Sequence, residues 1–234
     1  MCGFFAFAPG HSAEEIGTAL NLWTMPKAVR EEMERMESLK FYPKSFIPTV
    51  SKNSPNQLKF RYWSLVPRWW KQKVNDLKFS TFNARAEDLD TKATYRTPWK
   101  LGQRCLIPAT WFYEFETIKT DGKLHKAPYR VEDSDESIIT LAGLYEVLER
   151  EGDDPFESAT IITCSSEGTL KKVHARQPVI IKKEDRERWL SKDTPLEDVA
   201  SLLKADDDLK VEPIDPAFNK TFGDAVTEGM VKGE

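Results

Sequence analysis

The chain has 234 residues, 40% of them hydrophobic, and its seven Trp and thirteen Phe can furnish one substantial core. Charges or prolines interrupt every apolar segment before about 18 residues, which excludes a membrane span, and the mostly apolar first eight residues lack the basic region of a signal peptide. The formal net charge of −4 argues mildly against a long contact with duplex DNA, because many nucleic-acid binders are basic.

The first forty residues are predicted to be mainly helical after a short leading strand. Ser12 and Glu15 have the spacing of a capping box ahead of an apolar-periodic stretch. Pro26 can open a second helix, which is predicted to run through Lys40.

From Ile47 onward the helical pattern gives way to short segments rich in β-branched and aromatic residues, which are typical of strands. The predicted strands are residues 59–65, 105–107, 111–116, 129–131, 138–147, 159–164 and 209–213. Residues 119–126 and 149–155 are predicted as exposed hairpin loops, 184–190 and 196–204 as short helices, and the final fifteen as a weakly ordered tail. These elements predict an α+β fold whose β core is mostly antiparallel, barrel-like and flanked by short helices.

The cysteines and histidines do not form a recognisable metal-binding pattern. Cys2, Cys105 and Cys164 contain no close pair, so they resemble neither a disulfide framework nor a CxxC site, and the three histidines do not complete one. No zinc or other cofactor is expected. We expect one soluble, monomeric domain over residues 1–234, with a core over roughly residues 2–220, in the cytoplasm or, in a eukaryote, the nucleus.

Cys2 carries the most distinctive chemistry, because Met1 before a small residue is generally removed and Cys2 is then expected to be an exposed N-terminal residue. An α-amine has a lower pKa than a lysine ammonium, so much more of it is unprotonated near neutrality. An aldehyde that condenses with this amine forms an imine, on which the neighbouring thiol can close to give a five-membered thiazolidine. The ring-opened deoxyribose of an abasic site is such an aldehyde. From position alone, the alternative is that Cys2 is an apolar residue of the first strand.

Five ordered motifs are spread over nearly the whole chain. They are Met1-Cys2-Gly3, Trp63-Ser64-Leu65-Val66-Pro67-Arg68-Trp69, Asn83-Ala84-Arg85-Ala86-Glu87, Arg104-Cys105-Leu106-Ile107-Pro108-Ala109 with Phe112-Tyr113-Glu114, and His174-Ala175-Arg176-Gln177-Pro178-Val179. Together they resemble the motifs of the SRAP (SOS response-associated peptidase) family, although each alone is a weak signal. The resemblance implies an SRAP-like fold and covalent capture of abasic sites in single-stranded DNA.

The resemblance also implies roles for Asn83 and Arg85. Asn83 would hydrogen-bond near the Cys2 amine or the sugar, and Arg85 would clamp a phosphate beside the lesion with its forked donors. From the residues alone, Asn83 is equally a turn residue, and Arg85 is more often a surface ion-pair partner.

Glu114 lies in an apolar, aromatic segment where strand alternation places it on the same face as Phe112. Burial would raise its pKa toward the range of a general acid/base, and we assign it that catalytic role. The alternative is a structural salt bridge to Arg85 or Arg104. Glu116, farther out on the same face, is expected to be solvated.

Further residues are expected to act on the sugar or on the flanking DNA. His174 could exchange a proton with the sugar O4′ or a leaving phosphate, although a lone His is more often structural. Arg176 is expected to be a second phosphate clamp, and Arg68 belongs to a basic cluster that could form a DNA-binding patch. Trp69 and Trp70 are expected to stack on or wedge against bases beside the lesion, or else to be core residues.

The leading hypothesis is therefore a protein that shields abasic sites in single-stranded DNA by crosslinking to them in the DNA damage response. An imine could also break the strand by β-elimination, so a weak lyase activity is expected. The alternatives are an N-terminal-Cys peptidase or amidohydrolase, which could clip its own Met1, and a noncatalytic single-strand binder. Phe4 stands where the family commonly has Arg, which removes one candidate phosphate contact beside Cys2.

Overall fold

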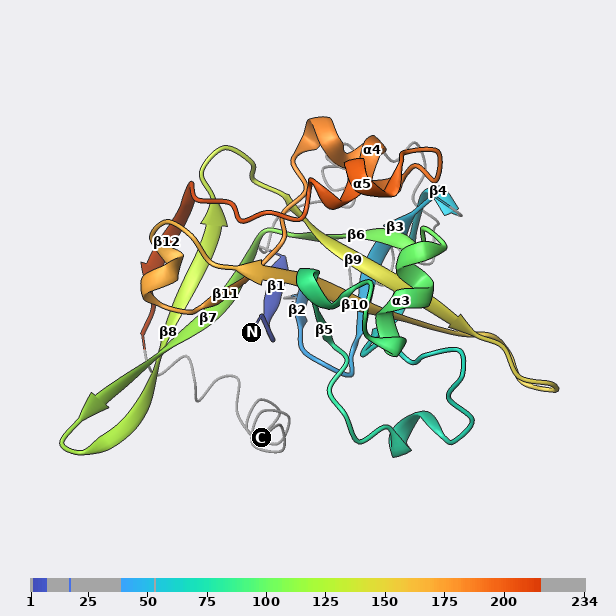
Figure 1. The fold of residues 1–234 in the computed structure, drawn as a ribbon. Coiled ribbons are helices and arrows are strands. Elements are labelled where there is room, and N and C mark those ends of the chain that lie inside the picture. The colour runs from blue at the N-terminus through green and yellow to red at the C-terminus, as the bar shows by residue number, and fades with distance from the viewer. Residues whose placement is uncertain (1, 8–16, 18–38, 53, 216–234) are drawn as a thin grey trace.

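The computed structural model describes residues 2–7, 17, 39–52 and 54–215, and it consists of two sheets with short helices around them (Figure 1). The larger sheet contains a closed five-stranded barrel. Its strands, in spatial order, are β10 (Phe156–Ser165), β4 (Ser54–Trp63), β3 (Phe46–Ser51), β6 (Arg104–Ala109) and β9 (Ile139–Leu148). Pairing of β9 with β10 closes the barrel, and within it only the β4–β10 pair is parallel.

Two further strands extend β10 and position the candidate site. β5 (Asn83–Arg85) runs parallel to β10, with Asn83 opposite Ile161. β11 (Arg176–Pro178) runs antiparallel to the end of β10, with Arg176 opposite Ser165. The segment after β5 and the segment before β11 are therefore brought to the same end of β10, where Glu87 pairs with Arg176.

The smaller sheet is antiparallel and carries the N-terminal segment. Its spatial order is β12 (Leu209–Pro213), β8 (Lys123–Asp133), β7 (Trp111–Thr120), β1 (Phe5–Phe7) and β2 (Leu39–Phe41). β7 and β8 form a long hairpin whose two turn residues, Asp121 and Gly122, have positive φ angles of 51° and 77°. Asp-Gly suits such a two-residue turn because both residues must adopt the left-handed conformation.

The helices lie outside the barrel (Figure 1). They are α3 (Ala93–Lys100), α4 (Arg186–Leu190) and α5 (Leu196–Ala200), together with the one-turn helices η1 (Val74–Asp76), η2 (Ala86–Asp88), η3 (Leu170–Lys172) and η4 (Lys183–Asp185). Tyr95 and Trp99 of α3 are four residues apart and bury one face of that helix with Trp189 of α4. None of the helices in the described ranges is long and apolar enough to cross a bilayer.

The predicted α+β class and the mostly antiparallel barrel core are confirmed, and β12 has the predicted bounds. The helices predicted in the first forty residues fall almost entirely outside the described residues, as does the predicted C-terminal tail. At Lys40 the prediction was wrong, because Leu39–Phe41 pairs with β1 and Phe41 is buried against Phe5. Helix α3 was not predicted, since Pro98 in its interior obscured the helical pattern.

Candidate reactive site around Cys2

Cys2 and Asn83 are joined directly. The side-chain Nδ2 of Asn83 donates a hydrogen bond of 2.8 Å to the backbone carbonyl oxygen of Cys2. Asn83 is itself fixed at the start of β5, where its own carbonyl accepts a 3.0 Å hydrogen bond from the Tyr95 hydroxyl. The structure thus brings the residue predicted to orient Cys2 into contact with it.

The expectation that Cys2 is exposed was wrong, because its side chain is fully buried. Cys2 precedes β1, which lies between β2 and β7, and it packs into the same core cluster as Phe5 and Phe112. Burial raises the pKa of the Cys2 thiol strongly, and the negative charge of Glu114 raises it further. At neutral pH the sulfur in this arrangement is a protonated thiol rather than a thiolate.

Glu114 is buried, with 2% of its surface exposed, on the face of β7 that also buries Phe112, as the strand alternation predicted. Burial raises the pKa of Glu114 to about 7. A carboxyl group with this pKa is present in both protonation states near neutrality, so it can give or take a proton. Glu116, two residues farther out, is only partly buried, and its carboxylate accepts a 2.9 Å hydrogen bond from the Tyr129 hydroxyl.

His174 faces Glu114, with 3.8 Å between its Nδ1 and the Glu114 Oε2. Burial lowers the pKa of His174, so the neutral imidazole prevails at neutral pH. The same Nδ1 lies 3.1 Å from the backbone nitrogen and 2.9 Å from the carbonyl oxygen of Arg176, and it accepts from the former or donates to the latter according to its tautomer. His174 and Glu114 therefore lie beside each other, at a distance longer than a hydrogen bond.

Cys2, Asn83, Glu114 and His174 form one cluster. It combines a thiol, an amide and two groups that can carry a proton. Asn83 adds one more feature, because its Oδ1 is a buried acceptor that receives no hydrogen bond from the residues that the structure describes. A buried acceptor of this kind costs free energy unless a donor satisfies it. A hydroxyl or amine brought in by a ligand would supply that donor.

The cations predicted to bind phosphate differ in their environment. Arg85 is exposed, lies two residues after Asn83 on β5, and forms no ion pair within the described ranges. The guanidinium of Arg176 is held by Glu87, with 3.0 Å from Nη2 to Oε2, and by the carbonyl of Thr163 at 2.6 Å. Arg85 is the register partner of Thr163, so the backbone of Arg85 and the guanidinium of Arg176 both lie beside this residue of β10.

Arg68 makes a contact that sequence reasoning did not predict. Its guanidinium binds both carboxylate oxygens of the buried Glu146, at 2.7 and 3.0 Å, and the oxygen of Gln103 at 2.9 Å. The partner lies 78 positions away on β9, so no local pattern reveals the pair. Arg68 thereby anchors the beginning of the loop that carries the neighbouring tryptophans.

Trp69 is exposed, and its ring is nearly parallel to that of Phe79, with 6.5 Å between centroids. Trp70 is only partly exposed and meets both rings edge-on. Phe79 was not predicted from the sequence, because the segment between Trp70 and Phe79 has no regular periodicity. The three rings form an aromatic surface of the kind on which bases stack.

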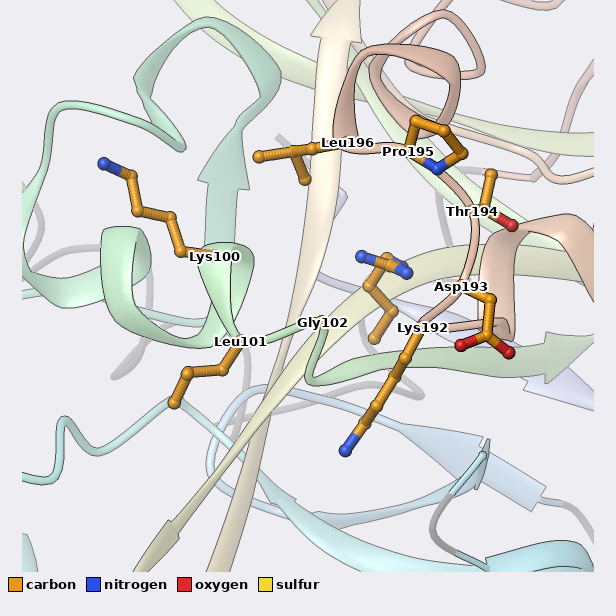
Figure 2. Close-up of a pocket in the computed structure, with 9 residues that line it drawn as sticks. Lys100, Leu101, Gly102, Lys192, Asp193, Thr194, Pro195 and Leu196 are labelled. Atoms are coloured by element: carbon orange, nitrogen blue, oxygen red, sulfur yellow. The ribbon is translucent and has the colours of Figure 1, made fainter.

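A separate pocket of about 270 Å³ lies between α3 and the segment that links α4 to α5, and Figure 2 shows its lining. It contains none of the residues predicted to be reactive. Arg104 lines it, but this side chain donates hydrogen bonds to the carbonyls of Trp189 and Ser191 at the end of α4. Lys100 and Lys192 point in different directions at its rim (Figure 2). The motif residue Arg104 therefore supports a helix end rather than Glu114.

Sequence comparisons relate nearly the whole chain to known proteins. The model of the SOS response associated peptidase (SRAP) family matches residues 1–221. The Abasic site processing protein YoqW of Bacillus subtilis is 32% identical over 161 residues, which are 68% of this chain and 69% of that protein. The Abasic site processing protein HMCES of Gallus gallus is 28% identical over 181 residues, 69% of this chain, and the match spans only 54% of that longer protein.

Solved structures show the same fold at lower sequence identity. A protein from Bacteroides thetaiotaomicron superposes with a TM-score of 0.80 at 22% identity, with 94% of each chain covered. A protein from Bordetella bronchiseptica superposes with a TM-score of 0.74 at 20% identity, covering 92% of this chain and all of that one. The barrel, the smaller sheet and their connections are thus a shared architecture.

Proposed function

This chain belongs to the SRAP family, and on that premise we propose that it captures abasic sites in single-stranded DNA covalently through Cys2. Two relatives that match 68% and 77% of it are named abasic site processing proteins. The observation that carries the proposal is the contact of Cys2 with Asn83 beside the buried Glu114 and His174. The proposal requires removal of residue 1, which converts the nitrogen of Cys2 into a free α-amine.

The first steps open the sugar ring and bond its C1′ to the Cys2 nitrogen. In the cyclic abasic deoxyribose, the C1′–O4′ bond breaks as the C1′ hydroxyl loses a proton to the Glu114 carboxylate and O4′ gains one from the protonated form of His174, which is the minor form at neutral pH. The Cys2 amine then adds to the C1′ aldehyde, the carbinolamine expels one water with the proton held by Glu114, and the resulting iminium returns a proton to His174 to give an imine. Because Glu114 titrates near neutrality, it can take the first proton and return it to the departing hydroxyl.

The second stage closes the ring through sulfur. The Cys2 sulfur adds to the imine carbon, its proton passes through Glu114 to the imine nitrogen, and a thiazolidine results. No electrons are exchanged with an outside oxidant, and one water is released over the whole sequence. The raised pKa of the thiol makes the neighbouring carboxylate useful here, since sulfur must lose its proton as it bonds.

Binding of the strand is assigned to residues at the rim of the cluster. Arg85, exposed and two residues after Asn83 on β5, takes a phosphate beside the lesion, and Arg176 contributes charge while it remains tied to Glu87. Trp69 and Trp70 stack with bases of the flanking strand. Arg68 acts through Glu146 by holding this tryptophan loop in place, and its remaining exposed surface adds positive charge.

The burial of Cys2 and Glu114 favours covalent capture over a hydrolase and over a noncatalytic binder. A hydrolase with Cys2 as nucleophile would begin with attack by a thiolate on an amide, which is a weaker electrophile than an imine, and burial and Glu114 disfavour that thiolate. A noncatalytic binder would have no use for a buried carboxyl group, which destabilises the fold. A weak lyase activity remains part of the proposal, because the imine activates the sugar for β-elimination.

An abasic oligonucleotide incubated with processed protein tests the proposal directly. We expect an adduct that survives denaturing electrophoresis, and none with an oligonucleotide of the same sequence that has all its bases. Cys2→Ala keeps an N-terminal amine but lacks the sulfur, so its imine should hydrolyse and leave no stable adduct. Equal adduct yields from Cys2→Ala and the unmodified protein would refute the thiazolidine.

A further inference from the structure

Glu87 ends the motif that begins at Asn83, and no chemical step has been assigned to it. It lies in the one-turn helix η2, directly after β5, and 54% of its side chain is exposed. The Nη1 and Nη2 of Arg176 donate to its two carboxylate oxygens at 2.5 and 3.0 Å. An exposed carboxylate is therefore held by one of the two guanidinium groups that are assigned to the DNA strand.

Glu87 also lies near the second of these groups, that of Arg85. The hydrogen bond from Arg176 is the main cause that lowers the pKa of Glu87, and the positive charge of Arg85 lowers it further. Glu87 is therefore ionised at neutral pH, and its negative charge lies within electrostatic reach of both cations. The neighbouring Asp88 forms a pair of its own, with 3.0 Å between its Oδ2 and the Nζ of Lys92.

The Arg176 donors that bind Glu87 are also the ones that suit a phosphate. A guanidinium offers its paired N–H groups to a carboxylate or to a phosphate with the same forked geometry. Arg85 and Arg176 carry two positive charges and Glu87 carries one negative charge, so the three side chains together present a net charge of +1. Like charges repel, and a phosphate beside Arg85 therefore gains less from Arg176 than it would without Glu87.

We propose that Glu87 is a specificity-determining residue, which weakens the reversible binding of DNA phosphates at Arg85 and Arg176. The inference rests on the function proposed above, in which these two arginines face the sugar-phosphate backbone. An intact strand is held by reversible contacts alone, so the negative charge of Glu87 favours its release. A strand with an abasic site meets the same repulsion, but the bond from its C1′ to Cys2 retains it. Lasting retention of a strand thus depends on the lesion.

The opposite role for Glu87 would be to hold Arg176 in place for a phosphate, but Arg176 has other anchors. Its Nη2 also donates to the carbonyl oxygen of Thr163 at 2.6 Å. Its backbone is fixed in β11, where it lies opposite Ser165 of β10, and only 14% of its side chain is exposed. We therefore expect Arg176 to keep its position when Glu87 is neutralised.

Two matched substitutions, Glu87→Gln and Glu212→Gln, test the inference. Each removes one negative charge and preserves the shape of the side chain. Glu212 is likewise paired with an arginine, Arg130, at 3.0 Å, but it lies on β12 in the smaller sheet. The side chains of Glu87 and Glu212 are 54% and 42% exposed, so neither variant is expected to unfold.

Reversible binding is measured with an intact single-stranded oligonucleotide of about 16 nucleotides, which requires no chemistry at Cys2. Glu87→Gln should bind it about fivefold more tightly at about 0.15 M salt, because one charge that repels the phosphates is lost. The salt slope should become steeper by about one, while Glu212→Gln should match the unmodified protein. Unchanged or weaker binding by Glu87→Gln would overturn the inference. An equal gain in both variants would also overturn it, because net charge alone would then be responsible.

Retention of damaged and intact strands is then compared at a protein concentration far below half-saturation by the intact oligonucleotide. After capture is complete, the ratio of retained abasic to retained intact oligonucleotide should be about fivefold lower for Glu87→Gln than for the unmodified protein, since only the reversible binding has changed. An equal ratio in the two proteins would contradict a role in specificity. Absence of any adduct with the unmodified protein would instead reject the proposed function, whereas the binding of the intact oligonucleotide tests Glu87 independently of that chemistry.

Discussion

Asn83 reaches across 81 positions of sequence to donate a hydrogen bond to the carbonyl oxygen of Cys2. This contact fixes the residue before β1 against β5, which is itself paired with the barrel strand β10. The proposed nucleophile is therefore tied to the barrel by a contact that is distant in sequence. Positioning of this kind lowers the entropic cost of reaction.

Loss of the Asn83 amide should slow capture. Asn83→Ala removes the donor to Cys2, and a lost hydrogen bond of about 1.4 kcal/mol corresponds to a rate about tenfold lower. The initial rate of adduct formation with a single-stranded abasic oligonucleotide measures this. Tyr95→Phe removes only the hydroxyl that supports the Asn83 carbonyl and should have a smaller effect. A Tyr95→Phe defect as large as that of Asn83→Ala would show that general loosening of β5 is responsible.

Glu114→Gln should change the pH dependence of the rate. The Cys2 amine loses its proton as pH rises, which accelerates both proteins, so their ratio isolates Glu114. Because the pKa of Glu114 is about 7, the ratio of the unmodified to the Glu114→Gln rate should grow as pH rises through about 7 and then level off. Rates are measured between pH 5 and 9. A ratio that stays constant across this range would remove Glu114 from proton transfer.

The same substitution should stabilise the fold at alkaline pH. A carboxyl group whose pKa is raised on folding binds more protons in the folded state, so it lowers stability as pH rises from its unfolded pKa toward 7. Glu114→Gln removes this penalty, which amounts to at most about 3 kcal/mol above pH 7. Denaturant unfolding at pH 5 and pH 8 should show a gain for Glu114→Gln that is larger at pH 8. A gain of the same size at both would contradict the raised pKa.

Substitutions of Arg85 and of Arg68 should have different effects, because Arg85 is assigned to DNA binding and Arg68 to support of the fold. Arg85→Gln is expected to lower the salt slope of single-strand binding by about one, with little change in Tm, because the side chain is exposed. Arg68→Gln leaves the buried Glu146 without its bidentate partner, and we expect a loss of about 1 kcal/mol, or a Tm drop of about 3 °C. Salt titrations and thermal melts of both variants check this. If Arg68→Gln lowers the salt slope as much as Arg85→Gln does, Arg68 is a phosphate contact after all.

Local patterns revealed most of the strands and the residues of the cluster, but not their environment. The alternation around Glu114 correctly placed it with Phe112, because period-two burial is a local property. Burial of Cys2 was missed, since it depends on β1 entering between β2 and β7, which are distant in sequence. The strand at Leu39–Phe41 was missed for the same reason, because its residues become a strand only by pairing with β1.

The long-range ion pairs could not be predicted from the sequence either. Arg68 and Arg176 were identified as basic residues near informative motifs, and nothing local indicated that Glu146 and Glu87 would hold their guanidinium groups. Phe79 joined Trp69 through a loop without periodicity. Residue type and spacing predicted which chemistry is present, whereas the sheet topology decides which groups are buried, paired or open to a ligand.

Intact-mass spectrometry of the protein with and without an abasic oligonucleotide is the most direct measurement of covalent capture by Cys2. The account predicts a protein that lacks Met1, and an adduct whose mass is the sum of this protein and the oligonucleotide less one water. Cys2→Ser should lose this stable adduct while a borohydride-trapped imine remains. An adduct of equal yield on protein that retains Met1 would contradict the account, because a blocked nitrogen can form neither the imine nor the thiazolidine.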